Sequence, residues 1–88
     1  MEKFMCTHTL PPGAFSVNQF QQFAEAAQHD PTVKGYRSFA NLAEGKVVCI
    51  MEADGKDAVE AWFKKMSMPF DSITKMELEG DRGSIHSA

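Results

Sequence analysis

The order of strand-like and helix-like segments constrains the fold of this 88-residue chain more than any other feature. Short segments with apolar or alternating side chains are typical of strands, and they cover residues 3–10, 35–42, 46–53 and 73–79. Helical patterns lie between the first and second strands and between the third and fourth. With right-handed crossovers, this order predicts an α+β, ferredoxin-like βαββαβ sandwich with two helices on one face of a four-stranded antiparallel sheet.

Local signals mark the boundaries of the first helix. Ser16 and Gln19 have the spacing of a capping box, and Phe15 and Phe20 have the spacing of a hydrophobic staple. The helix should end before Pro31, because a residue that precedes proline disfavours the helical backbone. Between these limits one apolar stripe recurs at helical spacing, made of Val17, Phe20, Phe23, Ala24 and Ala27.

The segment from the second strand to the C-terminus contains a hairpin, a helix and a final strand. Glu44-Gly45 predicts a two-residue turn, because glycine readily adopts a positive φ. That turn would set a register that pairs Ala40 with Cys49, Ser38 with Met51, and Arg37 with Glu52. A second helix should begin near Asp54 or Asp57, where Asp57-Ala58-Val59-Glu60 has the capping-box pattern, and its buried stripe would be Val59, Trp62, Phe63 and Met66. We expect one domain over residues 1–79 and a loose tail over residues 80–88.

The predicted order of strands across the sheet is fourth, first, third, second, so the first and third strands are neighbours. We expect the face with Phe39, Val48 and Ile50 to pack on the helices. The opposite face, with Cys49 and Met51, is also apolar and should not stay in contact with water. The sequence therefore predicts a homodimer in which two such faces meet and form a dimeric α/β barrel.

Charge and composition exclude several classes of partner. The formal net charge is -3, and no basic run is present, so we expect no nucleic-acid partner. No apolar segment approaches the roughly 20 residues that span a bilayer, so we expect no membrane partner. The N-terminal residues lack the layout of a signal peptide. We therefore expect a cytoplasmic protein whose two cysteines remain reduced thiols.

Cys6, His8 and Cys49 are the residues that suggest a metal site. Side chains alternate along a strand, so Cys6 and His8 share a face, and strand adjacency brings Cys49 to the same surface. Thiolate and imidazole ligands suit zinc, nickel or copper. Two other interpretations remain open. The cysteines can be small core residues beside a hydrogen-bonded histidine, or one of them can be a reactive thiol.

Tyr36 and Arg37 are the candidate residues for a small ligand. They follow Gly35 at the start of a strand, where they can orient an anionic or carbonyl group in the mouth of a barrel. The alternative is a packed tyrosine beside a cross-strand ion pair between Arg37 and Glu52.

Four short motifs carry a resemblance to known proteins: Phe4-Met5-Cys6-Thr7-His8, Gly35-Tyr36, Val47-Val48-Cys49-Ile50-Met51-Glu52-Ala53 and Pro69-Phe70-Asp71-Ser72-Ile73. On these residues the chain resembles a family of short ferredoxin-like proteins of unknown function that includes nickel-binding members. The resemblance implies a homodimer and a nickel site with His8 and Cys49 as ligands. The chain departs from it at Phe63, where many members have a histidine in the second helix.

These features lead to three functional hypotheses. The first is a homodimer that binds a divalent transition metal, nickel in particular, or a small molecule, through His8 and Cys49 with Cys6 or Tyr36 as auxiliary groups. The second is a cofactor-independent enzyme of the monooxygenase or isomerase type, suggested by fold alone. The third is an interaction module whose free sheet face binds a partner. The sequence by itself names no reaction.

Overall fold

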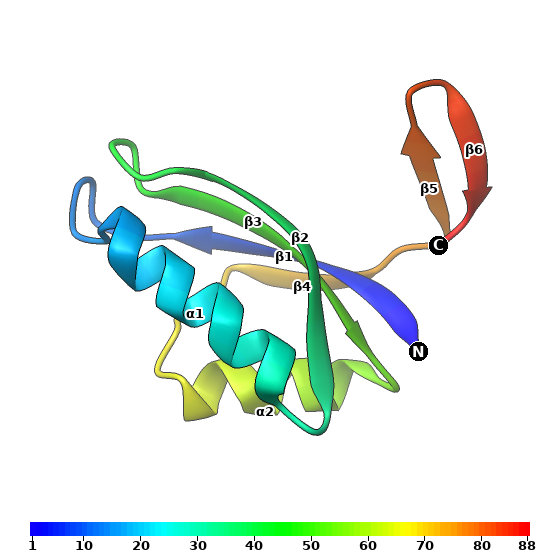
Figure 1. Cartoon of the computed structure of the whole chain (residues 1–88), viewed down its shortest axis with the longest axis horizontal. Coiled ribbons are helices and arrows are strands. Elements are labelled where there is room, and N and C mark those ends of the chain that lie inside the picture. Colours follow the sequence, from blue (N-terminus) through cyan, green and yellow to red (C-terminus); the bar gives the residue numbers. More distant parts are fainter.

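The computed structural model describes all 88 residues, and it places two helices beneath a four-stranded sheet (Figure 1). The elements are β1 (Glu2–Thr9), α1 (Val17–His29), β2 (Val33–Asn41), β3 (Lys46–Ala53), α2 (Lys56–Lys65), β4 (Ser72–Lys75), β5 (Leu78–Asp81) and β6 (Ser84–Ser87). The main sheet is antiparallel with the order β2-β3-β1-β4. The predicted α+β class and the adjacency of the first and third strands are therefore confirmed. None of the helices is long and apolar enough to span a membrane.

The two helices begin in different ways. The Ser16 hydroxyl accepts a hydrogen bond from the Gln19 backbone N–H, and the Ser16 N–H donates to the Gln19 side chain, so the predicted capping box of α1 is confirmed. The Phe15 and Phe20 rings lie 6.5 Å apart, as a hydrophobic staple requires. α2 begins after Gly55 without a side-chain cap, so the box predicted at Asp57 does not form.

The face of the sheet that packs on the helices is the opposite of the one predicted. The helix-facing, or inner, face buries alternate residues of β1 and β3, namely Phe4, Cys6, His8, Val47, Cys49, Met51 and Ala53. On the outer face Val48 and Ile50 are half-buried, and the Phe39 side chain is 64% exposed. The inner residues pack with Val59, Trp62 and Phe63 of α2 into one core. The outer row of β3 also carries Lys46 and Glu52, so the prediction gave too much weight to Val48 and Ile50.

The register of the β2–β3 hairpin differs from the prediction by two residues. Ser38 lies opposite Cys49 and Arg37 lies opposite Ile50, because the turn occupies four residues rather than two. A shift of two residues keeps every side chain on its face. A β-bulge then interrupts β2 between Gly35 and Arg37 and leaves Tyr36 without an opposite residue.

The C-terminal segment is a hairpin where a loose tail was expected. β4 ends at Lys75, and β5 pairs with β6 in a separate two-stranded sheet that extends beyond the main sheet (Figure 1). Glu79 ties this hairpin to the domain, since Lys3 Nζ donates to its Oε1 atom at 2.8 Å and the Tyr36 hydroxyl donates to its Oε2 atom. The single final strand predicted over residues 73–79 is therefore wrong, because the chain leaves the main sheet after Lys75 and residues 78–79 belong to a separate hairpin.

Candidate functional site

Cys6, His8 and Cys49 lie on one surface of the sheet, as alternation predicted, but that surface is the inner face, which the helices cover. Cys6 is directly opposite Cys49 in the β1–β3 register, and His8 is two residues farther along β1, opposite Val47. All three side chains are buried. The three groups are therefore neighbours in the core, and only Cys49 also borders a cleft.

His8 is held in a defined orientation. Its Nδ1 atom lies 2.8 Å from the Pro69 carbonyl oxygen, and its ring meets the Phe63 ring edge-on at 4.8 Å between centroids. A carbonyl oxygen only accepts hydrogen bonds, so Nδ1 carries the proton and Nε2 presents its lone pair. Nε2 is buried and has no hydrogen-bond partner. Burial also lowers the pKa of His8, which favours the neutral ring.

The two thiols are protonated near neutral pH. Burial and the neighbouring Cys49 raise the pKa of Cys6 to about 12, and burial raises the pKa of Cys49 to about 11. Both cysteines are free, and the Cys6 thiol points to the Phe4 carbonyl oxygen at 3.7 Å. Neutral buried thiols are poor nucleophiles, so the arrangement does not favour a reactive cysteine.

Of the three candidate ligands, only His8 is in a form that can bind a metal directly. The unpartnered Nε2 atom of His8 fits a metal ligand, because histidine ligands commonly donate their other N–H to a backbone carbonyl. The thiols would have to lose their protons before they bind a metal. No group of three or more histidine, cysteine, aspartate or glutamate side chains is arranged to hold a metal ion.

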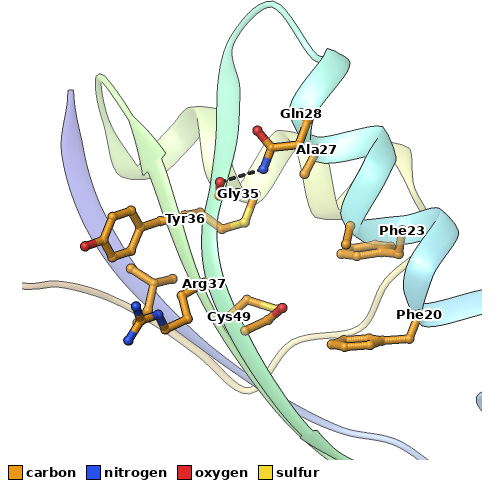
Figure 2. Close-up of a pocket in the computed structure, with 12 residues that line it drawn as sticks. Phe20, Phe23, Ala27, Gln28, Gly35, Tyr36, Arg37 and Cys49 are labelled. Carbon is orange, nitrogen blue, oxygen red and sulfur yellow. Dashed lines mark hydrogen bonds between the residues drawn. The ribbon is translucent and has the colours of Figure 1, made fainter. Parts of the chain in front are cut away.

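Tyr36 and Arg37 lie on the outer face, away from these groups. Figure 2 shows both side chains extending away from α1, whereas Phe20 and Phe23 extend from α1 toward the sheet. The bulge explains this, because it turns two successive residues of β2 to the same side. They border an outer cleft of about 190 Å³ between the sheet and the C-terminal hairpin.

Lys3 and Glu79 complete the outer cleft, and the sequence did not indicate either of them. The Lys3 ammonium lies 4.3 Å from the centroid of the Tyr36 ring. Hydrogen bonds from Lys3 and Tyr36 hold the pKa of the Glu79 carboxyl below its usual value.

The ion pair predicted between Arg37 and Glu52 does not form, since Lys34 is opposite Glu52 and Arg37 takes no part in any ion pair of the chain.

An inner cleft of about 200 Å³ lies between α1 and the sheet (Figure 2). Phe20, Phe23, Ala24 and Ala27 form its helical wall, and Gly35, Ser38, Cys49 and Met51 contribute from β2 and β3. The Gln28 amide spans its edge and donates to the Gly35 carbonyl oxygen at 2.6 Å. Gly35 was the one sequence signal for the β-bulge in β2, because a glycine inside a strand often marks a bulge.

Two helices on one face of this antiparallel sheet, over a buried histidine and two thiols, define a small α+β protein with the arrangement of the ferredoxin-like fold. Comparison with protein families is more specific. Residues 4–76 match the model of the family described as nickel responsive protein SCO4226-like, and the chain belongs to this family. The C-terminal hairpin lies outside the matched segment.

One solved structure shares the fold. SCO4226 from Streptomyces coelicolor A3(2) is 23% identical to this chain and superimposes with a TM-score of 0.73, over 89% of this chain and 99% of that one. At this identity the likeness concerns the fold alone. No curated protein matches the sequence.

Proposed function

We propose that the protein is a homodimer that binds a divalent transition metal, with nickel as the preferred ion and His8 as the imidazole ligand. The observation that carries this proposal is the buried Nε2 atom of His8, which has no partner while Nδ1 is fixed by the Pro69 carbonyl. An unsatisfied buried nitrogen is costly unless a ligand engages it. The family description, which names nickel responsiveness, supports the choice of ion.

The two thiols supply the further ligands in this proposal, and they must move toward His8 as the metal binds, because no three such groups surround one point in the chain alone. Cys49 is the preferred thiolate and Cys6 the auxiliary one, since the strand register places them opposite each other on the surface that carries His8. Their pKa values of about 11 and about 12 mean that a metal must displace a proton from each sulfur it binds. Affinity should therefore rise with pH over the neutral range, because fewer protons then compete for the sulfur atoms.

A nickel titration of protein purified without an affinity tag tests the imidazole ligand. We expect His8→Ala to weaken nickel binding by at least about tenfold in calorimetry, because even groups that only orient a ligand contribute that much. His29→Ala and His86→Ala are the matched controls, since both histidines are exposed and far from His8 in the sequence. Circular dichroism should show that each variant is folded. Identical isotherms for wild type and His8→Ala would end the proposal.

The outer sheet face supports the homodimer. Phe39 is exposed in the single chain, and it lies beside Val48 on the uncovered side of the sheet. A small domain that leaves such a face open gains stability when a second copy covers it, and a self-complementary face suits two-fold pairing. Packing of two outer faces would give the dimeric α/β barrel.

Charge placed on the outer face should break the homodimer. We expect Phe39→Glu to sediment as a monomer at concentrations where the wild type is a dimer, since the new carboxylate would lose its hydration in the interface. Val17→Glu is the matched control, because Val17 is 75% exposed on α1, away from the outer face. A dimer that persists in Phe39→Glu, or a wild type that is monomeric, would contradict the proposed interface.

A second candidate function is binding of a small anionic or carbonyl ligand by Tyr36 and Arg37. The observation that favours it is Arg37, whose guanidinium borders the outer cleft and has no ion-pair partner in the chain. A guanidinium binds a carboxylate through two parallel hydrogen bonds.

The two free thiols fit the cytoplasmic location that we propose for either function.

A further inference from the structure

The inner cleft exists because small residues face each other across the interface of α1 and β2. The bulge turns Tyr36 and Arg37 outward, so β2 presents only Gly35 and Ser38 to this part of the helix. α1 presents Ala24 and Ala27 from the other side. No large side chain occupies the space between them, and the cleft of about 200 Å³ is the result.

α1 packs loosely on the sheet for the same reason, namely that small residues face each other between α1 and β2. Ala27 is the one buried residue among the thirteen of this helix, whereas Phe20 and Phe23 are only half-buried and border the cleft. The hydrogen bond from Gln28 to Gly35 fixes the C-terminal end of α1 on the sheet. A Cβ atom at Gly35 would lie 3.1 Å from the Gln28 nitrogen, so glycine is what allows this close approach. The C-terminal end of α1 is therefore fixed against β2 at the edge of the cleft.

The lining defines the chemistry of a ligand. Arg37 is the one residue with a charged side chain along the cleft, and its side chain extends away from α1 (Figure 2). The Phe20 and Phe23 rings offer aromatic surfaces, and Ser38 supplies a hydroxyl. An apolar cavity of about 150 Å³ is already large enough for benzene. The cleft can therefore take one ring with a small substituent.

We propose that the inner cleft binds a neutral monocyclic aromatic molecule with one hydroxyl group. Its ring packs against Phe20 and Phe23, and its hydroxyl hydrogen-bonds to Ser38. α1 and the helix-facing residues of β2 and β3 supply most of the lining, so pairing of two outer faces would not fill the cleft. The inference does not depend on nickel, although Cys49 contributes to both the cleft and the proposed metal site.

Amide NMR with p-cresol as the probe tests this inference. We expect p-cresol to shift the resonances of the cleft residues at millimolar concentrations. Ala24→Leu should abolish these shifts, because the larger side chain fills the cleft, and it should leave the fold intact. Gln21→Leu is the matched control, since it adds the same side chain on the exposed part of α1 and should bind normally. Shifts confined to other surfaces, or binding that survives Ala24→Leu, would overturn the proposal.

A second variant examines the hydroxyl contact independently of the filled cleft. Ser38→Ala should weaken p-cresol binding about fivefold, the usual effect of one lost hydrogen bond, and should leave toluene binding unchanged. Equal losses for both probes, or none for p-cresol, would contradict the assigned role of Ser38. Repeating both titrations without added metal and with His8→Ala separates this site from the nickel site.

Discussion

Replacement of Phe63 by alanine should lower the free energy of unfolding by about 3–5 kcal/mol, the usual effect of removing a fully buried aromatic ring. The side chain is fully buried, and its ring packs edge-on to His8 at 4.8 Å and parallel to Phe23 at 6.3 Å. The Trp62 ring lies 5.6 Å away. A small domain has only about 5–15 kcal/mol of stability in total, so this one variant should remove a large part of it.

Urea denaturation of wild type and Phe63→Ala at the same protein concentration measures this loss. Phe20→Ala is the matched control, because the Phe20 ring is only half-buried at the edge of the inner cleft. We expect Phe20→Ala to be clearly less destabilising than Phe63→Ala. Equal losses for the two variants would show that the greater burial of the Phe63 ring does not increase its contribution to stability.

Gly45→Ala should be the most destabilising of the glycine substitutions. Gly45 has a φ of +73°, and an added Cβ atom would lie 1.9 Å from the carbonyl oxygen of Leu10. That atom belongs to the backbone and cannot rotate away. The Leu10 N–H also donates to the Gly45 carbonyl oxygen at 2.7 Å, so any movement that relieves the clash breaks this bond. The substitution should therefore separate the end of β1 from the hairpin turn.

Gly13→Ala provides a control with the same backbone conformation. Gly13 also has a φ of +73°, but an added Cβ atom would have no neighbour within 4 Å. Gly13→Ala should therefore cost only the strain of a left-handed backbone, about 1–2 kcal/mol. Thermal and urea unfolding should show a clearly larger loss for Gly45→Ala. Similar losses at the two positions would mean that the contact with Leu10 relaxes without cost.

The order of the helices and strands could be predicted, because it depends on local signals. The buried face of the sheet and the register of the hairpin were harder to predict, because they depend on contacts between distant residues. Ser16 and Gln19 form the box that their spacing indicated, because a cap depends only on residues in one turn. The choice of the buried sheet face was wrong, because it followed Val48 and Ile50 and ignored the two charged residues, Lys46 and Glu52, in the same row of β3. The other row, Val47, Cys49, Met51 and Ala53, is apolar throughout and packs against α2. Likewise, the length of the turn before Gly45 sets the register, and a glycine alone does not define that length.

The candidate site shows the same limit. Alternation correctly placed Cys6, His8 and Cys49 on one surface, since the period of two holds in any strand. Their burial depended on which face the helices cover. Glu79 could not be connected to Tyr36 from the sequence, because their contact requires both the bulge in β2 and the C-terminal hairpin. The inner cleft likewise depends on where the bulge interrupts the strand.

The bulge at Tyr36 has a consequence for how copies of the protein can associate. β2 is at the border of the sheet, with β3 on one side and no strand on the other. A straight border strand is a template for another chain, and repeated addition of strands leads to fibrils. An extra residue bends the backbone and disrupts the regular spacing of its free amide groups. This irregular border disfavours strand-by-strand growth at β2, and the opposite border strand, β4, has only four residues to offer a further chain.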